Sequence, residues 1–348
     1  HFGSSEETNQ MLDFYIVDAN GKRLPRASTS NDWQISKEDA AVAKYAVMHL
    51  PAEMFDMRHP ERYVGTEIHF LVEWTSHLLH IDRVESGNGF VRAYIPYPEL
   101  ASYNAHHPLT GKAMWLENSE GLLAENSDTY YYDQETGRLY YNEDDYALED
   151  FDTLAYAGLE RIFSFHDAEN VFVENIFFTG LDNKYIRRDS GASCGQGARL
   201  TLSNRDPNVP DISYEFMEAA PVFAKHINGL TVRNVSVDGT LGSGVVCKGA
   251  VENVTIDSCV FTNLGNAAIN LGEGQYDART SYVKGVEITN NYVYNIGTLY
   301  QASVAILGTF IANARVVGNT VIGVPYSAFS FGWMWATVGT TAEEIVKG

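Results

Sequence analysis

The sequence predicts an all-β fold, a right-handed parallel β-helix preceded by a β-rich accessory domain. A strand–corner–strand pattern recurs five times in the second half of the chain, which is the mark of a solenoid. The first half shows apolar–polar alternation without that repeat. These observations place the accessory domain at residues 1–150 and the β-helix at residues 151–348.

The first 150 residues contain clear strand signals. Residues 67–74 alternate between apolar and polar side chains, the period of a half-buried strand. Residues 128–133 and 138–141 are tyrosine-rich and flank the turn-forming stretch 134–137, which predicts a hairpin. We expect one helix, from Ser36 to Leu50, because Ser36 and Glu38 open an alanine-rich stretch.

The repeats of the second half each run from alternating residues through an Asn, Ser or Gly corner into a short apolar stretch. They occupy residues 170–178, 229–237, 253–261, 285–293 and 313–321. Their ends lie 59, 24, 32 and 28 residues apart, and the last three intervals suit single coils. Apolar stretches at residues 265–272, 302–308 and 327–332 are then interpreted as the second strand of each coil.

The 59-residue interval is too long for one coil and contains an insertion over residues 181–221, rich in Asp, Arg, Ser and Gly. Long insertions on regular scaffolds commonly carry function. At the other end, residues 340–348 provide no amphipathic cap for the open solenoid. We therefore expect the β-helix to be incomplete at its C-terminal end and to be completed by a companion chain or fragment.

The net charge of −21 disfavours nucleic acid, anionic lipid and acidic polysaccharides as partners, whereas neutral sugars remain compatible. Cys194, Cys247 and Cys259 form no CxxC pair, which favours structural thiols over a zinc site or a disulfide framework. We expect no metal and no cofactor. No apolar run is long enough to span a membrane, and the first residues lack the features of a signal peptide.

Two carboxylates of the insertion, Asp182 and Asp189, are the candidate catalytic residues. Hydrolysis of a glycosidic bond needs one carboxyl group to protonate the leaving oxygen and a second to act as nucleophile or base. The segment between them must fold back to bring the pair together, and Arg187 and Arg188 could keep one aspartate ionised while burial protonates the other. Solvated loop aspartates with arginine partners are the alternative interpretation.

The solenoid pattern, the preceding phenylalanine-rich strand and the aspartates seven residues apart resemble the lacto-N-biosidases of glycoside hydrolase family 136, which are parallel β-helix enzymes. The resemblance covers residues 60–340 as architecture and is residue-specific only at Asp182 and Asp189. It implies that Asp182 is the acid/base, that Asp189 is the nucleophile, and that lacto-N-biose is released from lacto-N-tetraose-like chains with retention. It also implies an extracellular or cell-surface bacterial protein. Members of the family have more coils than this chain.

Sugar sites add aromatic platforms and hydrogen-bonding groups to the catalytic pair. The candidates for substrate binding lie in the insertion or at coil ends, and they are Gln196, Glu273, Gln275, Trp333 and Trp335. Packing inside the solenoid is an equally good explanation for one of the two tryptophans, because residues two apart in a strand share a face.

Other chemistries fit the sequence less well. Residues 191–195 match the Gly-x-Ser-x-Gly elbow of serine hydrolases, with Asp206 or Asp211 and His226 following, but an elbow needs a strand–turn–helix context. His77, His80, His106 and His107 lack a third metal ligand at suitable spacing.

Two alternative functions stay open, another β-helix glycosidase acting on neutral glycans and a non-catalytic glycan-binding β-helix such as an adhesin or tail protein. The long polar insertion favours an enzyme over a binding module.

Overall fold

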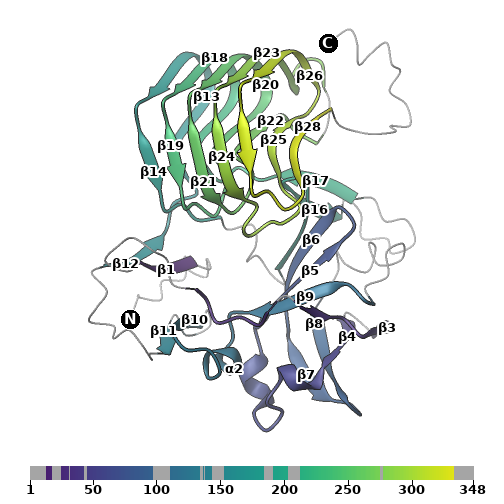
Figure 1. Cartoon of the computed structure of the whole chain (residues 1–348). Helices are drawn as coiled ribbons and strands as arrows, with labels where there is room; N and C mark the ends of the chain where they lie inside the picture. The colour runs from purple at the N-terminus through teal and green to yellow at the C-terminus, as the bar shows by residue number, and fades with distance from the viewer. Residues whose placement is uncertain are drawn as a thin grey trace. The chain divides into compact units, whose positions relative to one another are not determined.

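The computed structural model describes residues 13–17, 25–30, 32–42, 45–96, 110–133, 136, 138–142, 153–183, 191–202, 212–274 and 277–332. The chain divides into two compact units (Figure 1). The N-terminal unit comprises residues 1–157, 184–193 and 200–212, and the solenoid unit comprises residues 158–183, 194–199 and 213–348. The insertion after the first coil therefore contributes to both units. None of the described helices is long and apolar enough to cross a membrane.

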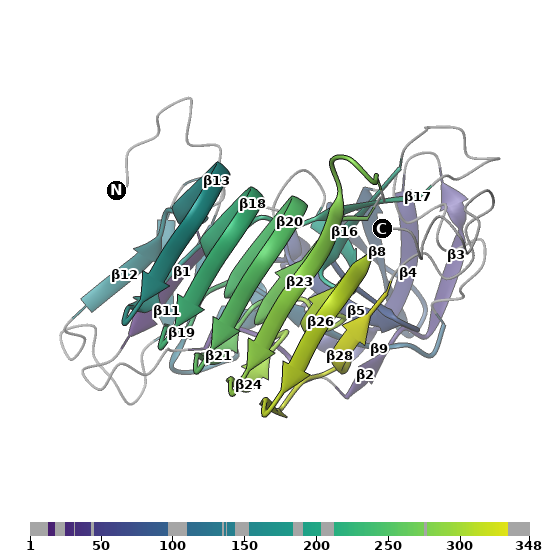
Figure 2. The same cartoon turned by 90° about the horizontal axis from the view of Figure 1, so that it is seen from above.

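The solenoid unit is a parallel β-helix whose coils stack strand on strand (Figures 1 and 2). Its long strands form one parallel sheet, β13 (Arg161–Glu174), β18 (Ala220–Arg233), β20 (Val245–Asp257), β23 (Tyr282–Thr289) and β26 (Ile311–Val317). The short strands that follow form a second sheet, β14 (Phe177–Thr179), β19 (Ser236–Asp238), β21 (Val260–Leu264), β24 (Tyr292–Ile296) and β27 (Thr320–Ile322). The first residues of β20 pair with a further stack, β22 (Ile269–Leu271), β25 (Val304–Gly308) and β28 (Ser327–Phe331).

The register of the second sheet confirms the repeat read from the sequence. Phe178 pairs with Val237, Val237 with Phe261, Phe261 with Val293 and Val293 with Val321. These five residues are the ends of the five predicted repeats, so each interval between them is one coil. The predicted all-β solenoid is confirmed, and the long first interval is a coil that carries the insertion.

Left-handed residues form the corner between the long and the short strands. Asn175, Asn234, Ser258 and Asn290 all have φ between 51° and 60°, and Gly318 has φ 73°. Asparagine adopts this conformation at low cost because its short side chain can hydrogen-bond locally. The amide Nδ2 of Asn234 donates to Oδ1 of Asn175 at 2.6 Å, so the corners also bond from coil to coil.

A second asparagine stack lies inside the solenoid. Asn291 is 1% exposed; its Oδ1 accepts from the backbone N–H of Cys259 at 2.9 Å, and its Nδ2 donates to Asn319 Oδ1 at 2.9 Å and to Ile256 O at 3.0 Å. The side chain thereby satisfies backbone groups that the corner leaves unpaired in an apolar interior. It binds three successive coils together.

The three cysteines are free and buried. Burial raises the pKa of the Cys247 thiol to about 12 and that of the Cys259 thiol to about 11, and it also raises the pKa of Cys194. Such thiols stay protonated and unreactive at neutral pH.

The N-terminal unit is built from antiparallel sheets. One contains, as neighbours in this order, β6 (Thr75–His80), β5 (Glu67–Val72), β9 (Ala113–Glu117) and β2 (Trp33–Gln34), and it continues beyond β6 into strands of the insertion. Another has the order β3-β4-β8-β7, from β3 (Lys37–Val42), β4 (Tyr45–Pro51), β8 (Phe90–Pro96) and β7 (Arg83–Ser86). The remaining described elements are β1 (Asp13–Val17), η1 (Ala52–Met54), η2 (Pro60–Tyr63), α2 (Glu120–Leu123), β10 (Thr129–Asp133), β11 (Arg138–Asn142) and β12 (Thr153–Ala157).

The tyrosine-rich hairpin is confirmed as the β10–β11 pair, and the strand expected at residues 67–74 is confirmed over Glu67–Val72 as β5, while residues 73 and 74 form the turn into β6. The helix expected from Ser36 to Leu50 is wrong, because that stretch forms β3 and β4. β4 pairs with β8 along its whole length, and Val47 to Leu50 are fully buried. Pairing on both sides and burial of Val47, Met48 and Leu50 outweigh the helix propensity of the alanines.

Candidate functional site

Asp182 lies at the first turn of the solenoid, directly after β14. Gly180, with φ 70°, turns the chain inward, and the Asp182 side chain is buried with 0% exposure. Its backbone N–H donates to Leu159 O at 2.9 Å, and its Oδ1 accepts from the N–H of Asn183 at 2.7 Å. A carboxyl group is therefore fixed inside the polar start of the insertion.

The turns of the next coils stack on this residue. Leu241 N donates to Leu181 O at 2.9 Å, and Asn266 N donates to Gly242 O at 3.1 Å. Asp182 thus lies two coils before Asn266. Because neighbouring coils are roughly 4.8 Å apart, the backbones of the two residues are separated by about 10 Å. Glycine is required for this close stacking, because a Cβ on Gly265 would lie 2.2 Å from the carbonyl oxygen of Leu241.

The insertion returns to the same turns through β15 (Gly191–Gly195) and β16 (Ala198–Leu202). Gln196 N donates to Ala302 O at 3.0 Å. Gly197, with φ 84°, approaches so closely that a Cβ would lie 3.3 Å from Asn266 Oδ1 and 3.6 Å from Asn270 Nδ2. The sharp turn at these two residues therefore places the insertion backbone against the solenoid turn that carries Asn266 and Asn270.

We name this region the polar row, comprising Asp182, Gln196, Ser243, Asn266 and Asn270, all buried. Asn266 is satisfied, because Ser303 Oγ donates to its Oδ1 at 2.6 Å. Within the described residues, Gln196 Oε1, Ser243 Oγ and both amide atoms of Asn270 have no hydrogen-bond partner. Each such group costs about 1–3 kcal/mol if nothing pairs with it. Buried groups of this kind are usually paired by an ordered water or by a polar ligand group.

The predicted site residues fall into two groups. Asp182 and Gln196 belong to the polar row, whereas Glu273 is half-buried beyond β22, three residues past Asn270, where its carbonyl accepts from Thr309 Oγ1 at 2.8 Å. The other predicted residues lie outside the described residues, and they are Asp189, Gln275, Trp333 and Trp335.

Ser243, Asn266 and Asn270 are polar-row residues that sequence reasoning missed. A signal for two of them was present: Asn266 and Asn270 interrupt the apolar stretch of residues 264–271, in which the other non-glycine side chains are apolar. A polar residue in an otherwise buried run needs a partner, which is the mark of a site or of a satisfied ladder.

The Gly-x-Ser-x-Gly stretch is a strand, β15, and not the turn into a helix that a hydrolase elbow needs. Ser193 Oγ lies 2.8 Å from Nδ1 of His77, and Nε2 of His77 lies 2.9 Å from Thr75 Oγ1. Thr75 Oγ1 donates to Val72 O at 2.7 Å, so it accepts from His77, and His77 in turn accepts from Ser193. Burial lowers the pKa of His77 to about 3, so the imidazole is a poor base at neutral pH. The Ser193–His77–Thr75 hydrogen bonds are therefore structural, and they do not form a nucleophile–base pair.

A cluster of Glu67, His69 and Glu117 in the N-terminal unit offers ligand atoms within 4.8 Å of one another. Arg26 already pairs with Glu67 at 2.7 Å and with Glu117 at 3.6 Å, and His69 Nε2 lies 3.1 Å from Glu117. Burial opposes the charging of His69, but both carboxylates together raise its pKa. Arg26 already compensates the carboxylates, and the raised pKa of His69 favours its charged form beside them, so the cluster is best described as a buried ion-pair network.

A search of solved structures finds a chain described as a glycoside hydrolase, with a TM-score of 0.72 and 20% sequence identity. The alignment covers 94% of this chain and 61% of that one, so this chain spans about three-fifths of its neighbour's length. At this identity the likeness shows the fold alone. No protein-family model matches the chain, and no curated protein does.

Proposed function

We propose that this chain carries the catalytic centre of a retaining glycoside hydrolase that acts on neutral, GlcNAc-containing oligosaccharides and releases lacto-N-biose from lacto-N-tetraose-type chains. The observation that carries the proposal is the fixed, buried carboxyl group of Asp182 at the head of a polar row that spans three coils. The fold shared with a glycoside hydrolase supports the class, and the resemblance of the aspartate pair to family 136 supports the substrate.

Asp182 suits the role of general acid. A carboxyl group that must donate a proton near neutral pH is best held away from bulk water, and this side chain is fully buried. In the first step Asp182 would protonate the leaving oxygen while Asp189 attacks the anomeric carbon to form a glycosyl-enzyme. In the second step Asp182 would take a proton from water, and the water would displace Asp189.

The polar row would bind the sugar. Gln196 Oε1, Ser243 Oγ and the Asn270 amide offer both acceptors and donors, which match the hydroxyl and acetamido groups of a neutral glycan. Glu273 and Gln275, together with Trp333 and Trp335, remain candidates for contacts further along the substrate.

The test is release of lactose from lacto-N-tetraose by the intact protein and by Asp182→Asn and Asp189→Asn variants. We expect each substitution to lower kcat at least about a hundredfold, the range of a lost general acid or nucleophile. Asn at position 182 keeps the oxygen that accepts from Asn183, so the fold should survive.

Asp167→Asn is the matched control, because Asp167 is exposed on the solenoid with φ 49°, a conformation that asparagine tolerates. It should hydrolyse the substrate at the parental rate. Full activity in the Asp182 variant would remove that residue from catalysis. Absence of hydrolysis by the parent, with retained binding of the tetrasaccharide, would favour a glycan-binding β-helix.

A further inference from the structure

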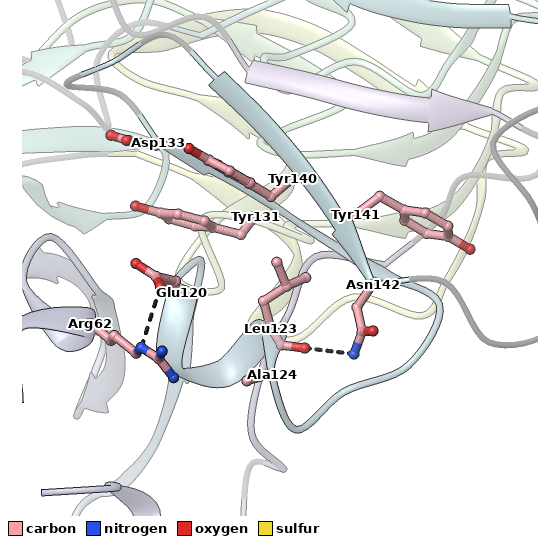
Figure 3. A pocket seen from close by; sticks show the side chains of 9 residues that line it. All are labelled: Arg62, Glu120, Leu123, Ala124, Tyr131, Asp133, Tyr140, Tyr141 and Asn142. Atoms are coloured by element: carbon pink, nitrogen blue, oxygen red, sulfur yellow. Dashed lines mark hydrogen bonds and ion pairs between the residues drawn. The ribbon is translucent and has the colours of Figure 1, made fainter. Parts of the chain in front are cut away.

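The N-terminal unit contains a pocket of about 390 Å³ that the catalytic proposal does not use. It lies between α2 and the β10–β11 hairpin (Figure 3). Its volume is at the small end of the range of about 300–1,000 Å³ for pockets that bind small molecules. Its walls are formed by Arg62, Glu120, Leu123, Ala124, Tyr131, Asp133, Tyr140, Tyr141 and Asn142.

The hairpin register explains the aromatic wall of this pocket. Tyr131 and Tyr140 are directly opposed across the strands, so both side chains stand on one face, whereas the neighbouring Tyr141 stands on the other. The two rings stack with centroids 5.9 Å apart and 17° between their planes. Tyr140 is 39% exposed, a large value for an aromatic ring already packed on another. In Figure 3 the pair faces Glu120 and Arg62, while Tyr141 points away.

The pocket is also rich in hydrogen-bonding groups. Arg62 Nε lies 3.3 Å from Glu120 Oε1, with both side chains more than a third exposed, so the pair presents donors and acceptors side by side. Asp133 accepts from the backbone N–H and the hydroxyl of Thr136, which fixes the position of its carboxylate at the pocket wall. Asn142 is held by its Nδ2, which donates to Leu123 O at 2.8 Å.

We propose that this pocket is a second carbohydrate site that binds one or two neutral sugar rings without cleaving them. A flat stacked aromatic pair provides the surface on which the apolar face of a pyranose packs. The fixed carboxylate and the guanidinium–carboxylate pair match the vicinal hydroxyl groups at the ring edge. An anionic ligand would meet Glu120 and Asp133, which outnumber Arg62, and is disfavoured by the net charge of −21.

The experiment is titration of the intact protein with lactose and, separately, with N-acetyllactosamine, followed by saturation-transfer NMR and calorimetry. We expect millimolar binding in the parent. Tyr140→Ala and Tyr140→Leu should each weaken it at least about fivefold, the size typical of losing an aromatic anchor. Leucine keeps apolar bulk without the flat ring, so it separates ring stacking from simple packing. Tyr294→Ala, which removes an exposed tyrosine of the solenoid, is the matched control and should bind as the parent does.

Two further variants separate this pocket from the catalytic centre. Asp182→Asn should bind both disaccharides like the parent, and Tyr140→Leu should hydrolyse lacto-N-tetraose at the parental rate if the proposed activity holds. Binding unaffected by either Tyr140 substitution would overturn the second site, whatever the outcome of the hydrolysis assay. No binding of either disaccharide, with binding of a trilysine peptide instead, would also overturn it and assign the pocket to cationic side chains.

Discussion

Asn291 shows what a single buried amide does in this β-helix. Its side chain bonds to Cys259 N, Ile256 O and Asn319 Oδ1, beside the apolar core cluster of the solenoid. An apolar residue at this position would remove a partner from a backbone donor and from a backbone acceptor inside the coil stack.

We expect Asn291→Ala to lower the free energy of unfolding by about 2–4 kcal/mol, because two buried backbone groups each lose a partner. Denaturant unfolding followed by circular dichroism measures the change. Thr320→Ala, an exposed residue of the next coil, should change stability by less than about 0.5 kcal/mol. Equal effects of the two substitutions would contradict the role of Asn291.

His69 makes the stability of the N-terminal unit depend on pH. Burial favours the neutral imidazole, but the hydrogen bonds and charges of Glu117 and Glu67 have the larger combined effect and raise the pKa of His69 above the ordinary value of 6.5. A raised folded-state pKa stabilises the fold fully below about pH 6.5, and this contribution is lost as pH rises through the folded-state pKa.

The unfolding midpoint of the parent should therefore fall between pH 6 and pH 9 more steeply than that of His69→Gln. Gln keeps a polar side chain but cannot carry the charge. Parallel pH profiles of the two proteins would show that His69 stays neutral in the fold.

At the scale of the element, the turns before β20 and β22 depend on glycine. Gly265 has no positive φ, yet a Cβ there would lie 2.2 Å from Leu241 O. Gly323, in contrast, has φ 67° and only ordinary contacts around a built Cβ.

Gly265→Ala should therefore cost more than about 3 kcal/mol or prevent folding, whereas Gly323→Ala should cost about 1–2 kcal/mol for its left-handed backbone alone. Thermal unfolding or the soluble yield of each variant reports the difference. A Gly265→Ala variant as stable as Gly323→Ala would show that the coils can move apart at this turn.

The coil elements were predictable because their signal is periodic. The alternation from Asn170 to Phe178 and its four copies specify both the strands and their register, since a slip by one residue would expose the apolar face. The stretch from Ser36 to Leu50 has no such copies, so local alanine propensity misled the prediction. The polar row was only half predictable, because Gly197, next to Gln196, approaches Asn266 and Asn270 through a turn of the insertion that no local pattern encodes.

At the scale of the whole molecule, the net charge affects the stability of the fold. A net charge of −21 on 348 residues makes the folded state repel itself, and added salt screens that repulsion. The melting temperature should rise by a few degrees between about 10 mM and about 300 mM NaCl. Differential scanning fluorimetry measures the shift, with sorbitol at equal osmolarity as the control. A melting temperature that falls with salt would mean that specific ion pairs outweigh the net repulsion.

The same negative charge disfavours acidic substrates and is compatible with neutral ones. A neutral tetrasaccharide should be hydrolysed at a rate that hardly depends on ionic strength, since no long-range attraction or repulsion acts on it. Polygalacturonate should neither bind nor be cleaved at low salt. The proposal that the chain acts on neutral glycans thus agrees with its composition as well as with the polar row.

Hydrolysis of lacto-N-tetraose followed by ¹H NMR from the first minutes tests the central claim most directly, because it reads lactose release and the anomeric form of the other product together. The account predicts lactose and the β-anomer of lacto-N-biose from the parent, and loss of both signals with Asp182→Asn. Release of the α-anomer first would contradict a retaining mechanism. Undiminished release by the Asp182 variant would contradict the placement of the catalytic centre at the head of the polar row.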